Sequence, residues 1–161
     1  TGIRFFTVYG PWGRPDMAPI IFANSITNKK PLKIFNNGNM FRDFTYIEDV
    51  TKIMANLVNK KPERKDKLTQ NSTDPSKSWA PFRIFNIGNG TSISLLDFIS
   101  LLEKELGLKA IKVFEEMQLG DVERTFADTK SIESNINLKP KTSLEEGLKK
   151  FVNWYKYFYL N

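Results

Sequence analysis

The stretch "IRFFTV" (3–8) near the amino end is the segment that most limits the folds open to this chain. Its residues favour β structure, and apolar side chains stand at both even and odd positions. A strand that faces water on one side alternates apolar and polar residues, whereas a strand covered on both sides does not. We therefore expect residues 3–8 to form a central strand of a covered sheet.

Segments with strand and helix patterns alternate along the rest of the chain. Asp16 is a plausible cap for the first helix, Ser94 and Ser143 begin the later ones, and Gly107 ends one of them. The turn "NNGN" (36–39) predicts a hairpin. The alternation predicts an α/β or α+β class in which short sheets are covered by helices. The expected strands lie at 31–35, 40–46, 82–89 and 110–116, and the expected helices at 16–28, 47–59, 95–107 and 144–160.

Composition excludes several kinds of chemistry. The chain has no cysteine and no histidine, so disulfides, thiolate nucleophiles, the usual zinc sites and Ser-His-Asp triads are excluded, and no metal site is expected. No apolar run approaches the roughly 20 residues that span a bilayer, and no signal peptide is visible. The net charge of +6 would permit nucleic-acid binding, but much of the excess lies in the proline-containing polar segment 59–81. We expect a mobile polar insertion there, with neither nucleic acid nor membrane as a partner.

The loop "YGPWGRPDM" (9–17) holds one cation, Arg14, between Gly13 and Pro15. These neighbours restrict the backbone to a turn, so the side chain can be aimed. The planar guanidinium suits bidentate recognition of a carboxylate or phosphate. The alternative is a surface arginine paired with Asp16.

Two further stretches carry polar groups suited to a ligand. In "MFRDFTY" (40–46), strand alternation places Arg42 and Phe44 on one face, which could bind a phosphate beside a ring. Alternatively, Arg42 and its neighbour are charges that discourage pairing at a sheet edge. In "MQLGDV" (117–122), Gln118 and Asp121 could hydrogen-bond a ribose or phosphate, although such turns also occur without a ligand. The last helix carries aromatic residues at helical spacing, which predicts a packing face: Phe151, Trp154, Tyr155 and Phe158.

Taken together and in order, four stretches resemble the carboxyl-terminal half of UDP-glucuronate 4-epimerases, in the extended short-chain dehydrogenase/reductase family. They are "RFFTVYGPWGRPDM", "PLKIFNNGNMFRDFTYIEDV", "WAPFRIFNIGNGTSISLLDFISLLEKELG" and "MQLGDVERTFADT". The resemblance covers nearly the whole chain. It implies an α/β fold in which residues 1–161 are the carboxyl-terminal substrate-binding part of an extended Rossmann-type epimerase. Residues 1–10 would be the last major strand of its cofactor domain. The sequence begins at Thr1 without Met, and we expect a piece of a longer protein.

The resemblance implies an NAD-dependent isomerase, in which the sugar C4 hydroxyl is oxidised, the ketosugar rotates, and the hydride returns to its other face. The family's Tyr-x-x-x-Lys pair and Gly-x-x-Gly-x-x-Gly loop are absent from this sequence. We therefore expect no catalytic residue here, no NAD bound to this piece, and no activity from it alone. The longer protein would be cytoplasmic, would use NAD, and would supply UDP-galacturonate for surface polysaccharide. The alternatives are another nucleotide-sugar epimerase or dehydratase, and a stand-alone nucleotide-sugar-binding or interaction module.

Matching positions imply a set of site residues for a UDP-sugar. Arg14 would face the sugar carboxylate and Thr7 would contact the sugar. Gln118 stands where some relatives carry an arginine for a phosphate, so its contact departs from the pattern. The other implied contacts are Phe35 beside the uridine, Arg42 on the pyrophosphate, Asp121 near the ribose, and Phe5 and Phe6 near the nicotinamide. Strand 3–8 without its neighbours would expose an edge, which makes a homodimer a reasonable hypothesis.

Overall fold

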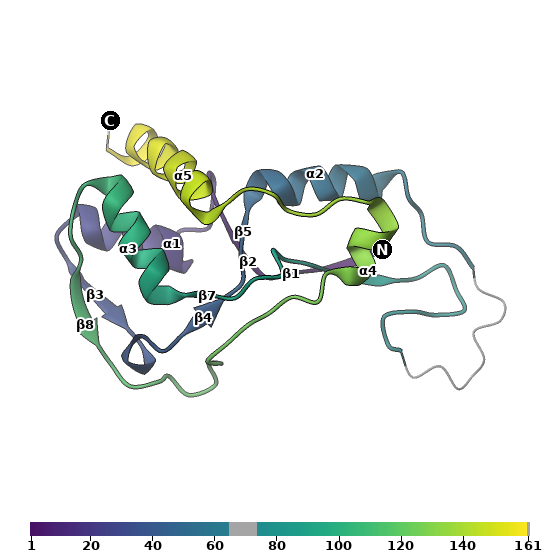
Figure 1. The fold of residues 1–161 in the computed structure, drawn as a ribbon, viewed down its shortest axis with the longest axis horizontal. Helices are drawn as coiled ribbons and strands as arrows, with labels where there is room; N and C mark the ends of the chain where they lie inside the picture. Colours follow the sequence, from purple (N-terminus) through teal and green to yellow (C-terminus); the bar gives the residue numbers. More distant parts are fainter. Residues whose placement is uncertain (65–73, 161) are drawn as a thin grey trace.

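A computed structural model describes residues 1–64 and 74–160, and Figure 1 shows the chain. Helices α2 and α4 lie toward one end, α1, α3 and α5 lie toward the other, and β2 and β5 run between them (Figure 1). The strands are β1 (Gly2–Phe5), β2 (Thr7–Tyr9), β3 (Pro31–Ile34), β4 (Phe41–Arg42), β5 (Phe44–Tyr46), β6 (Ile84–Ile87), β7 (Ile93–Ser94) and β8 (Ile111–Phe114). The helices are α1 (Ala18–Thr27), α2 (Ile47–Val58), α3 (Leu95–Leu106), α4 (Lys130–Ile136) and α5 (Leu144–Tyr159), with a 3-10 turn, η1, at Asn36–Gly38.

The strands pair two by two, and the fold has the expected α/β class with short sheets and covering helices. β1 pairs with β6, β2 with β5 and β3 with β8 in parallel, and β4 pairs with β7 antiparallel. The expected single strand 3–8 is divided at Phe6. The Phe6 N–H donates to the Ile87 carbonyl at 3.0 Å, and the next N–H, of Thr7, donates to the Asp43 carbonyl at 3.1 Å. The chain thus changes partner from β6 to β5 within one residue.

The predicted hairpin around residues 36–39 is wrong. β3 takes β8 as its neighbour, and β4 takes β7. Asn36, Asn37 and Gly38 do adopt the positive φ values that the turn residues allow, at 51°, 50° and 83°. However, the Asn37 N–H donates to the Glu115 carbonyl at 3.0 Å, so the turn is tied to the end of β8. It redirects the chain and does not reverse it.

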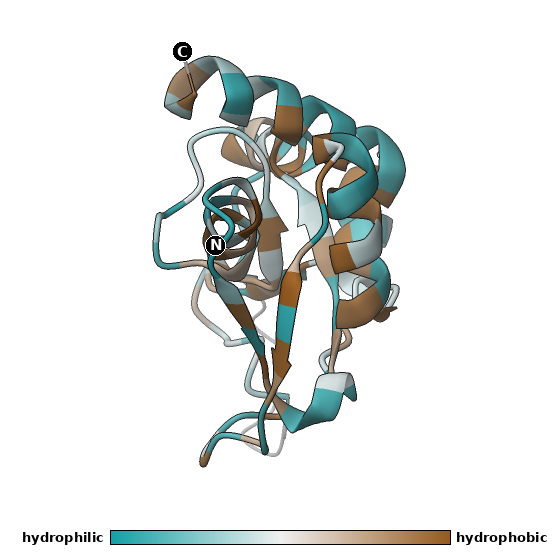
Figure 2. Cartoon of the chain, turned by 90° about the vertical axis from the view of Figure 1, so that its left-hand side faces the viewer, coloured by the Kyte–Doolittle hydropathy of each residue, from teal (hydrophilic) through white to brown (hydrophobic). Residues whose placement is uncertain are grey.

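The larger hydrophobic core lies among α1, α3, α5 and strands β2, β3 and β5. Figure 2 shows hydrophobic residues on the strands between the helices. Asp16 is not the cap of α1: the helix begins after Met17, and the Asp16 carboxylate is taken by Arg14. Ile21, expected on the apolar side of this helix, is 43% exposed because it lies on the outer face. Fully buried members of this core include Ile20, Ile26, Leu32, Ile34, Tyr46, Phe98, Leu102, Phe151 and Tyr155.

A smaller core joins α2, α4 and β6 around Val50, Ile53 and Ile87. Met54, on the same predicted face of α2, is 40% exposed. Helix α4 was not expected from the sequence, because its seven residues contribute just two buried apolar side chains, Ile132 and Ile136. Within the described ranges, no helix has both the length and the apolar character needed to cross a membrane.

The predicted signals at the ends of α3 and α5 are confirmed. The Leu96 N–H donates to Ser94 Oγ at 3.2 Å, and the Glu146 N–H donates to Ser143 Oγ at 3.2 Å. Gly107 ends α3 in the left-handed conformation, with φ of 72°. The predicted mobile insertion 59–81 falls in part on residues 65–73, which lie outside the described residues.

Candidate functional site

The structure brings together two of the site residues expected from the sequence, Arg42 and Asp121. Arg42 ends β4, and its Nη2 donates to Asp121 Oδ1 at 2.8 Å. Its Nη1 donates to the carbonyls of Phe41 at 2.9 Å and Glu123 at 3.1 Å. The Arg42 side chain is 17% exposed. These acceptors fix the guanidinium in place while leaving part of it accessible to a ligand.

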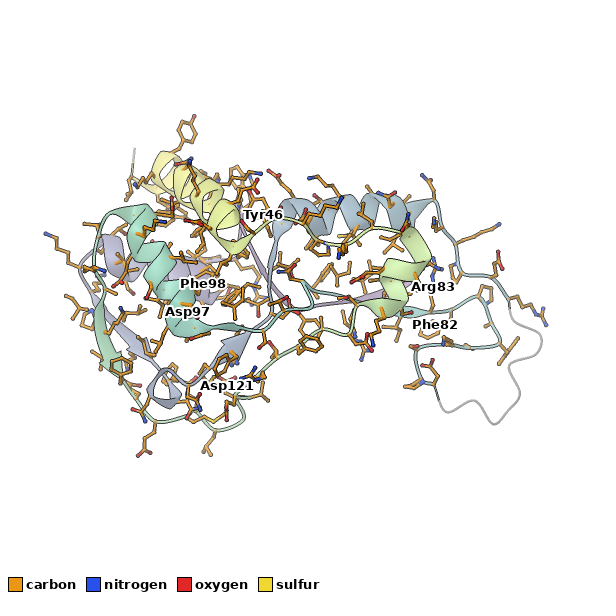
Figure 3. The ribbon with its side chains drawn as sticks, in the orientation of Figure 1. Tyr46, Phe82, Arg83, Asp97, Phe98 and Asp121 are labelled. Carbon is orange, nitrogen blue, oxygen red and sulfur yellow. The ribbon has the colours of Figure 1, made fainter. Side chains whose placement is uncertain are left out.

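Asp121 lies on the long loop that passes beneath β4 and β7 (Figure 3). The Asp121 N–H donates to the Gln118 carbonyl at 3.2 Å, and Gly120 has φ of 85°, so residues 118–121 form the predicted turn. The chain then runs beside β4: the Phe41 N–H donates to the Glu123 carbonyl at 2.8 Å. This pairing holds Asp121 beside Arg42. The Gln118 side chain is exposed on the same turn.

Asp43, next to Arg42, has a role that the sequence analysis missed. Its carboxylate is fully buried and accepts three backbone N–H groups, from Asn89 at 2.7 Å, Gly90 at 3.0 Å and Ala127 at 3.1 Å. Its carbonyl accepts the Thr7 N–H at 3.1 Å. One residue therefore joins β2, the turn after β6 and the 121–127 segment.

This arrangement requires the glycine that follows β6. A Cβ at Gly88 would lie 2.3 Å from the Ala127 Cβ and 3.0 Å from Asp43 Oδ2. Glycine is therefore needed at position 88 for the close approach of the two segments. The sequence marks a glycine-containing turn, which exposes N–H groups, but it does not place Asp43 against that turn, because Asp43 and Asn89 are 46 residues apart.

Arg14 is in the arrangement that the sequence analysis gave as its alternative. Nε and Nη2 of Arg14 donate to the two Asp16 carboxylate oxygens at 3.1 and 2.7 Å. This hydrogen bonding raises the pKa of Arg14 and lowers the pKa of Asp16. The Arg14 side chain is 72% exposed. Among the described residues, no hydrogen bond or ion pair joins Arg14 to the Arg42–Asp121 pair.

The remaining expected site residues lie on several elements. Thr7 begins β2 and is partly buried, and Phe35 follows β3 directly before η1. Phe5 ends β1 and is 50% exposed, with Phe6 partly buried beside it. β3 lies toward the end of the molecule opposite α2, whereas β1 lies nearer the middle (Figure 1). Phe35 and the Phe5–Phe6 pair thus occupy different regions.

The residues present do not fit a complete NAD site. Phe5, which is 50% exposed, has an apolar ring of the kind that packs against a nicotinamide, whereas the neighbouring Phe6 is partly buried. The chain has no glycine-rich phosphate loop following a strand, which is the feature that holds a dinucleotide pyrophosphate. At most, this chain contributes one wall of such a site.

A cavity of about 720 Å³ lies between α4 and residues 59–63 and 76–85. None of the expected site residues lines it, and Figure 3 shows Phe82 and Arg83 beside α4, away from Asp121. Two of its cations already have acceptors: Lys60 Nζ donates to the Asn135 carbonyl at 2.7 Å, and Arg83 Nε donates to Thr1 Oγ1 at 3.0 Å. This cavity is therefore not favoured as the nucleotide-sugar site.

Comparison with known proteins agrees with the resemblance seen in the sequence. The profile of the NAD dependent epimerase/dehydratase family matches residues 1–88. Protein CapI of Staphylococcus aureus is 42% identical over 99% of this chain and 48% of its own length. A probable UDP-glucuronate 4-epimerase of Rhizobium meliloti is 44% identical over 96% of this chain and 46% of its own length.

Among solved structures, UDP-glucuronic acid 4-epimerase from Bacillus cereus, in complex with UDP-glucuronic acid and NAD, matches with a TM-score of 0.78. It is 33% identical, and the match covers 98% of this chain and 45% of that one. The chain thus spans about half the length of these relatives. The α/β class and the resemblance to UDP-glucuronate 4-epimerases are both confirmed. The chain belongs to the NAD dependent epimerase/dehydratase family.

Proposed function

We propose that this chain is the carboxyl-terminal, UDP-sugar-binding half of an NAD-dependent UDP-glucuronate 4-epimerase. The observation that carries the proposal is the Arg42–Asp121 ion pair, at 2.8 Å. The two residues are distant in sequence, and the guanidinium of Arg42 is partly accessible. The names of the relatives and the fraction of their length that is matched support the same assignment.

In this proposal, Arg42 binds the pyrophosphate of the substrate. A diphosphate offers the guanidinium two anionic oxygens in the geometry that suits its fork. Asp121 would then turn one oxygen toward a ribose hydroxyl, while Phe35 would lie against the uracil. The bonds from Arg42 Nη1 to the Phe41 and Glu123 carbonyls, at 2.9 and 3.1 Å, would hold the guanidinium in place while Arg42 binds the pyrophosphate and Asp121 turns toward the ribose.

Arg14 would bind the carboxylate that distinguishes glucuronate from glucose, and Thr7 would contact the sugar ring. Asp16 already presents Arg14 with a planar carboxylate in bidentate geometry, at 3.1 and 2.7 Å. A glucuronate carboxylate has the same shape and charge, so the substrate would replace Asp16 at the guanidinium. Both side chains are highly exposed, and exposed ion pairs contribute little to stability, so breaking the Arg14–Asp16 pair should cost little free energy.

When bound in the longer protein, NAD would take the hydride from the sugar C4 and return it. This chain would supply binding and orientation, with Phe5 and Phe6 at the nicotinamide side, and no group that moves the C4 proton. The cytoplasmic location and the absence of a nucleic-acid partner stay predictions.

A second candidate is an epimerase for a neutral UDP-sugar. The Arg14–Asp16 pair favours it, because a guanidinium that keeps its own carboxylate would not require one on the substrate. Arg14→Ala separates the two candidates: it should lower turnover of UDP-glucuronate selectively in the first and affect neither sugar selectively in the second. Arg42→Ala should weaken both sugars alike, because they share the pyrophosphate.

The proposal is tested with the full-length protein encoded by the reading frame that contains these residues. Incubated with NAD and UDP-glucuronate, it should form UDP-galacturonate, measured by anion-exchange chromatography. The 161-residue chain alone should give no product and no transient NADH absorbance. Turnover by the chain alone would contradict the assignment of roles, and a reading frame that encodes only these residues would favour a stand-alone binding module.

A further inference from the structure

We propose that Trp12 is a positioning residue for Arg14, because its indole ring fastens the 10–16 loop to α5. The inference rests on the proposed function, in which Arg14 binds the substrate carboxylate. It adds a role for the carboxyl-terminal helix, which carries none of the expected ligand contacts: α5 would fix the geometry of the loop that selects the sugar.

The backbone of the loop has an unusual conformation at Trp12. Its φ is 62°, in the left-handed region that residues with a Cβ rarely adopt and bulky residues adopt least. Gly10 also has positive φ, at 137°, and a Cβ there would lie 2.4 Å from Ile47 Cγ2. The loop therefore turns at two constrained positions. Gly10 is held by the packing around it, whereas Trp12 requires another contact to hold it.

That contact is an aromatic cluster on α5. The Trp12 ring centroid lies 5.7 Å from that of Trp154 and 4.9 Å from that of Phe158, with interplanar angles of 58° and 72°. Trp154 and Phe158 stack on each other at 5.5 Å and 14°. Tilted and edge-to-face pairs at these distances are favourable. The Trp12 side chain is fastened although the residue is 73% exposed.

Helix α5 is a firm base for this contact. Phe151 and Tyr155, on its inner side, are fully buried in the larger core. The Tyr155 hydroxyl also donates to Asn24 Oδ1 of α1 at 2.5 Å. The aromatic cluster thus connects the loop to a helix that cannot shift without disturbing the core.

Arg14 lies between this anchor and the start of α1. On its other side, the Met17 N–H donates to the Arg14 carbonyl at 3.1 Å, and Pro19 and Ile20 are buried. The backbone at Arg14 is therefore held from both directions. Removing the Trp12 ring would remove the restraint from α5 and leave only the restraint at the start of α1. The Arg14 guanidinium would then sample orientations in which it does not contact the substrate.

The test measures kcat/KM for UDP-glucuronate and UDP-glucose in the full-length protein. Trp12→Ala removes the ring from the loop, and Phe158→Ala removes its partner from α5 while leaving the loop sequence intact. Trp12→Phe keeps an aromatic ring. Tyr157→Ala is the matched control, since this ring is on the same helix, is 76% exposed, and makes no ring contact with Trp12 among the described residues. Arg14→Ala gives the reference value of the kcat/KM ratio when the carboxylate contact is lost entirely.

We expect Trp12→Ala and Phe158→Ala to lower the ratio of kcat/KM for UDP-glucuronate to kcat/KM for UDP-glucose about tenfold. This effect is smaller than the roughly hundredfold loss of rate that a misplaced group can cause. The loss should lie mainly in KM for UDP-glucuronate, with UDP-glucose turnover and the thermal midpoint little changed. Trp12→Phe should recover most of the ratio, and Tyr157→Ala should not alter it.

Equal losses for both sugars would overturn the inference, because they indicate a general structural role. A ratio that falls in Arg14→Ala but is unchanged in Trp12→Ala would also overturn it while leaving the proposed function in place. A ratio unaffected by Arg14→Ala would contradict the proposed function itself, and the inference with it.

Discussion

Arg42 and Asp43 are neighbours in sequence with opposite environments. The guanidinium of Arg42 lies at the surface beside Asp121, whereas the Asp43 carboxylate is fully buried. Burying a carboxylate costs free energy unless it is hydrogen-bonded, and three backbone N–H groups offset that cost. Because Asp43 fixes both the chain beside Arg42 and the segment that carries Asp121, the buried residue determines the geometry of the accessible pair.

Asp43→Asn should destabilise the full-length protein. The amide would place an NH₂ group against N–H donors that the carboxylate accepted, a loss of about 2–3 kcal/mol for hydrogen bonds to a charged group. The measurement is the thermal midpoint, which should fall by several degrees. Asp16→Asn is the matched control: Asp16 is exposed, and the midpoint should change little. A midpoint for Asp43→Asn equal to that of the control would contradict this role.

Sequence reasoning succeeded at helix ends whose capping groups lie a few residues away, except at Asp16, whose carboxylate pairs with Arg14. Ser94, Ser143 and Gly107 act within their own helix ends, where spacing alone specifies the contact. Arg42 and Asp121 were each predicted as site residues, but their pairing, 79 residues apart, depends on the tertiary fold. The same holds for Asp43, whose donors come from two distant segments.

Element pairing shows the same limit. The NNGN turn has the residues of a hairpin, and the left-handed conformations that those residues favour do form. β3 nonetheless pairs with β8, which begins at residue 111, far along the chain. Turn residues determine which backbone angles are accessible, whereas the partner of a strand is decided by which faces are buried. Glu103 shows how that distant strand is attached.

Glu103 fastens β8 to α3 and should give the protein an acid-sensitive contact. The residue is 4% exposed, and its carboxylate accepts the Ala110 N–H at 2.8 Å and Lys112 Nζ at 3.1 Å. Burial raises the pKa of Glu103, but these donors outweigh it, and the pKa is lowered from 4.5. A carboxyl group whose pKa is lower in the folded state stabilises the fold above its unfolded pKa and loses this effect as pH falls through the folded pKa.

Glu103→Gln should therefore lower the thermal midpoint at pH 7 and should reduce the further drop on acidification to pH 4 and below. The expected cost at pH 7 is about 1.5–3 kcal/mol, as for a hydrogen-bonded charged group. Glu145→Gln serves as control, because Glu145 also pairs with a lysine but is 59% exposed, and exposed pairs contribute little. Equal midpoints for the two variants at pH 7 would show that Glu103 does not fasten β8.

The molecule buries its apolar side chains in two separate hydrophobic cores. The strip of sheet formed by β1 and β6 lies with the smaller one, and among the described residues no other strand pairs with β1. The N–H groups of Gly2 and Phe6 donate to Arg83 and Ile87 of the β6 segment. By strand alternation, the backbone groups of Ile3 and Phe5 point to the opposite edge, which is free.

A free edge of this kind can pair with a second copy of the chain. We expect the 161-residue chain alone to form dimers at high concentration, measured by light scattering after size-exclusion chromatography. Ile3→Pro should shift it toward monomer, because proline removes an N–H from the free edge without touching the bonds to β6. Val58→Lys alters an 81% exposed apolar residue on α2 and should leave the dimer intact.

In the full-length protein of the proposed function, the edge would continue into the rest of the sheet, so Ile3→Pro should there lower stability and leave the oligomeric state unchanged. A clean monomer of the isolated chain at high concentration, or a dimer that Ile3→Pro does not weaken, would contradict pairing through β1.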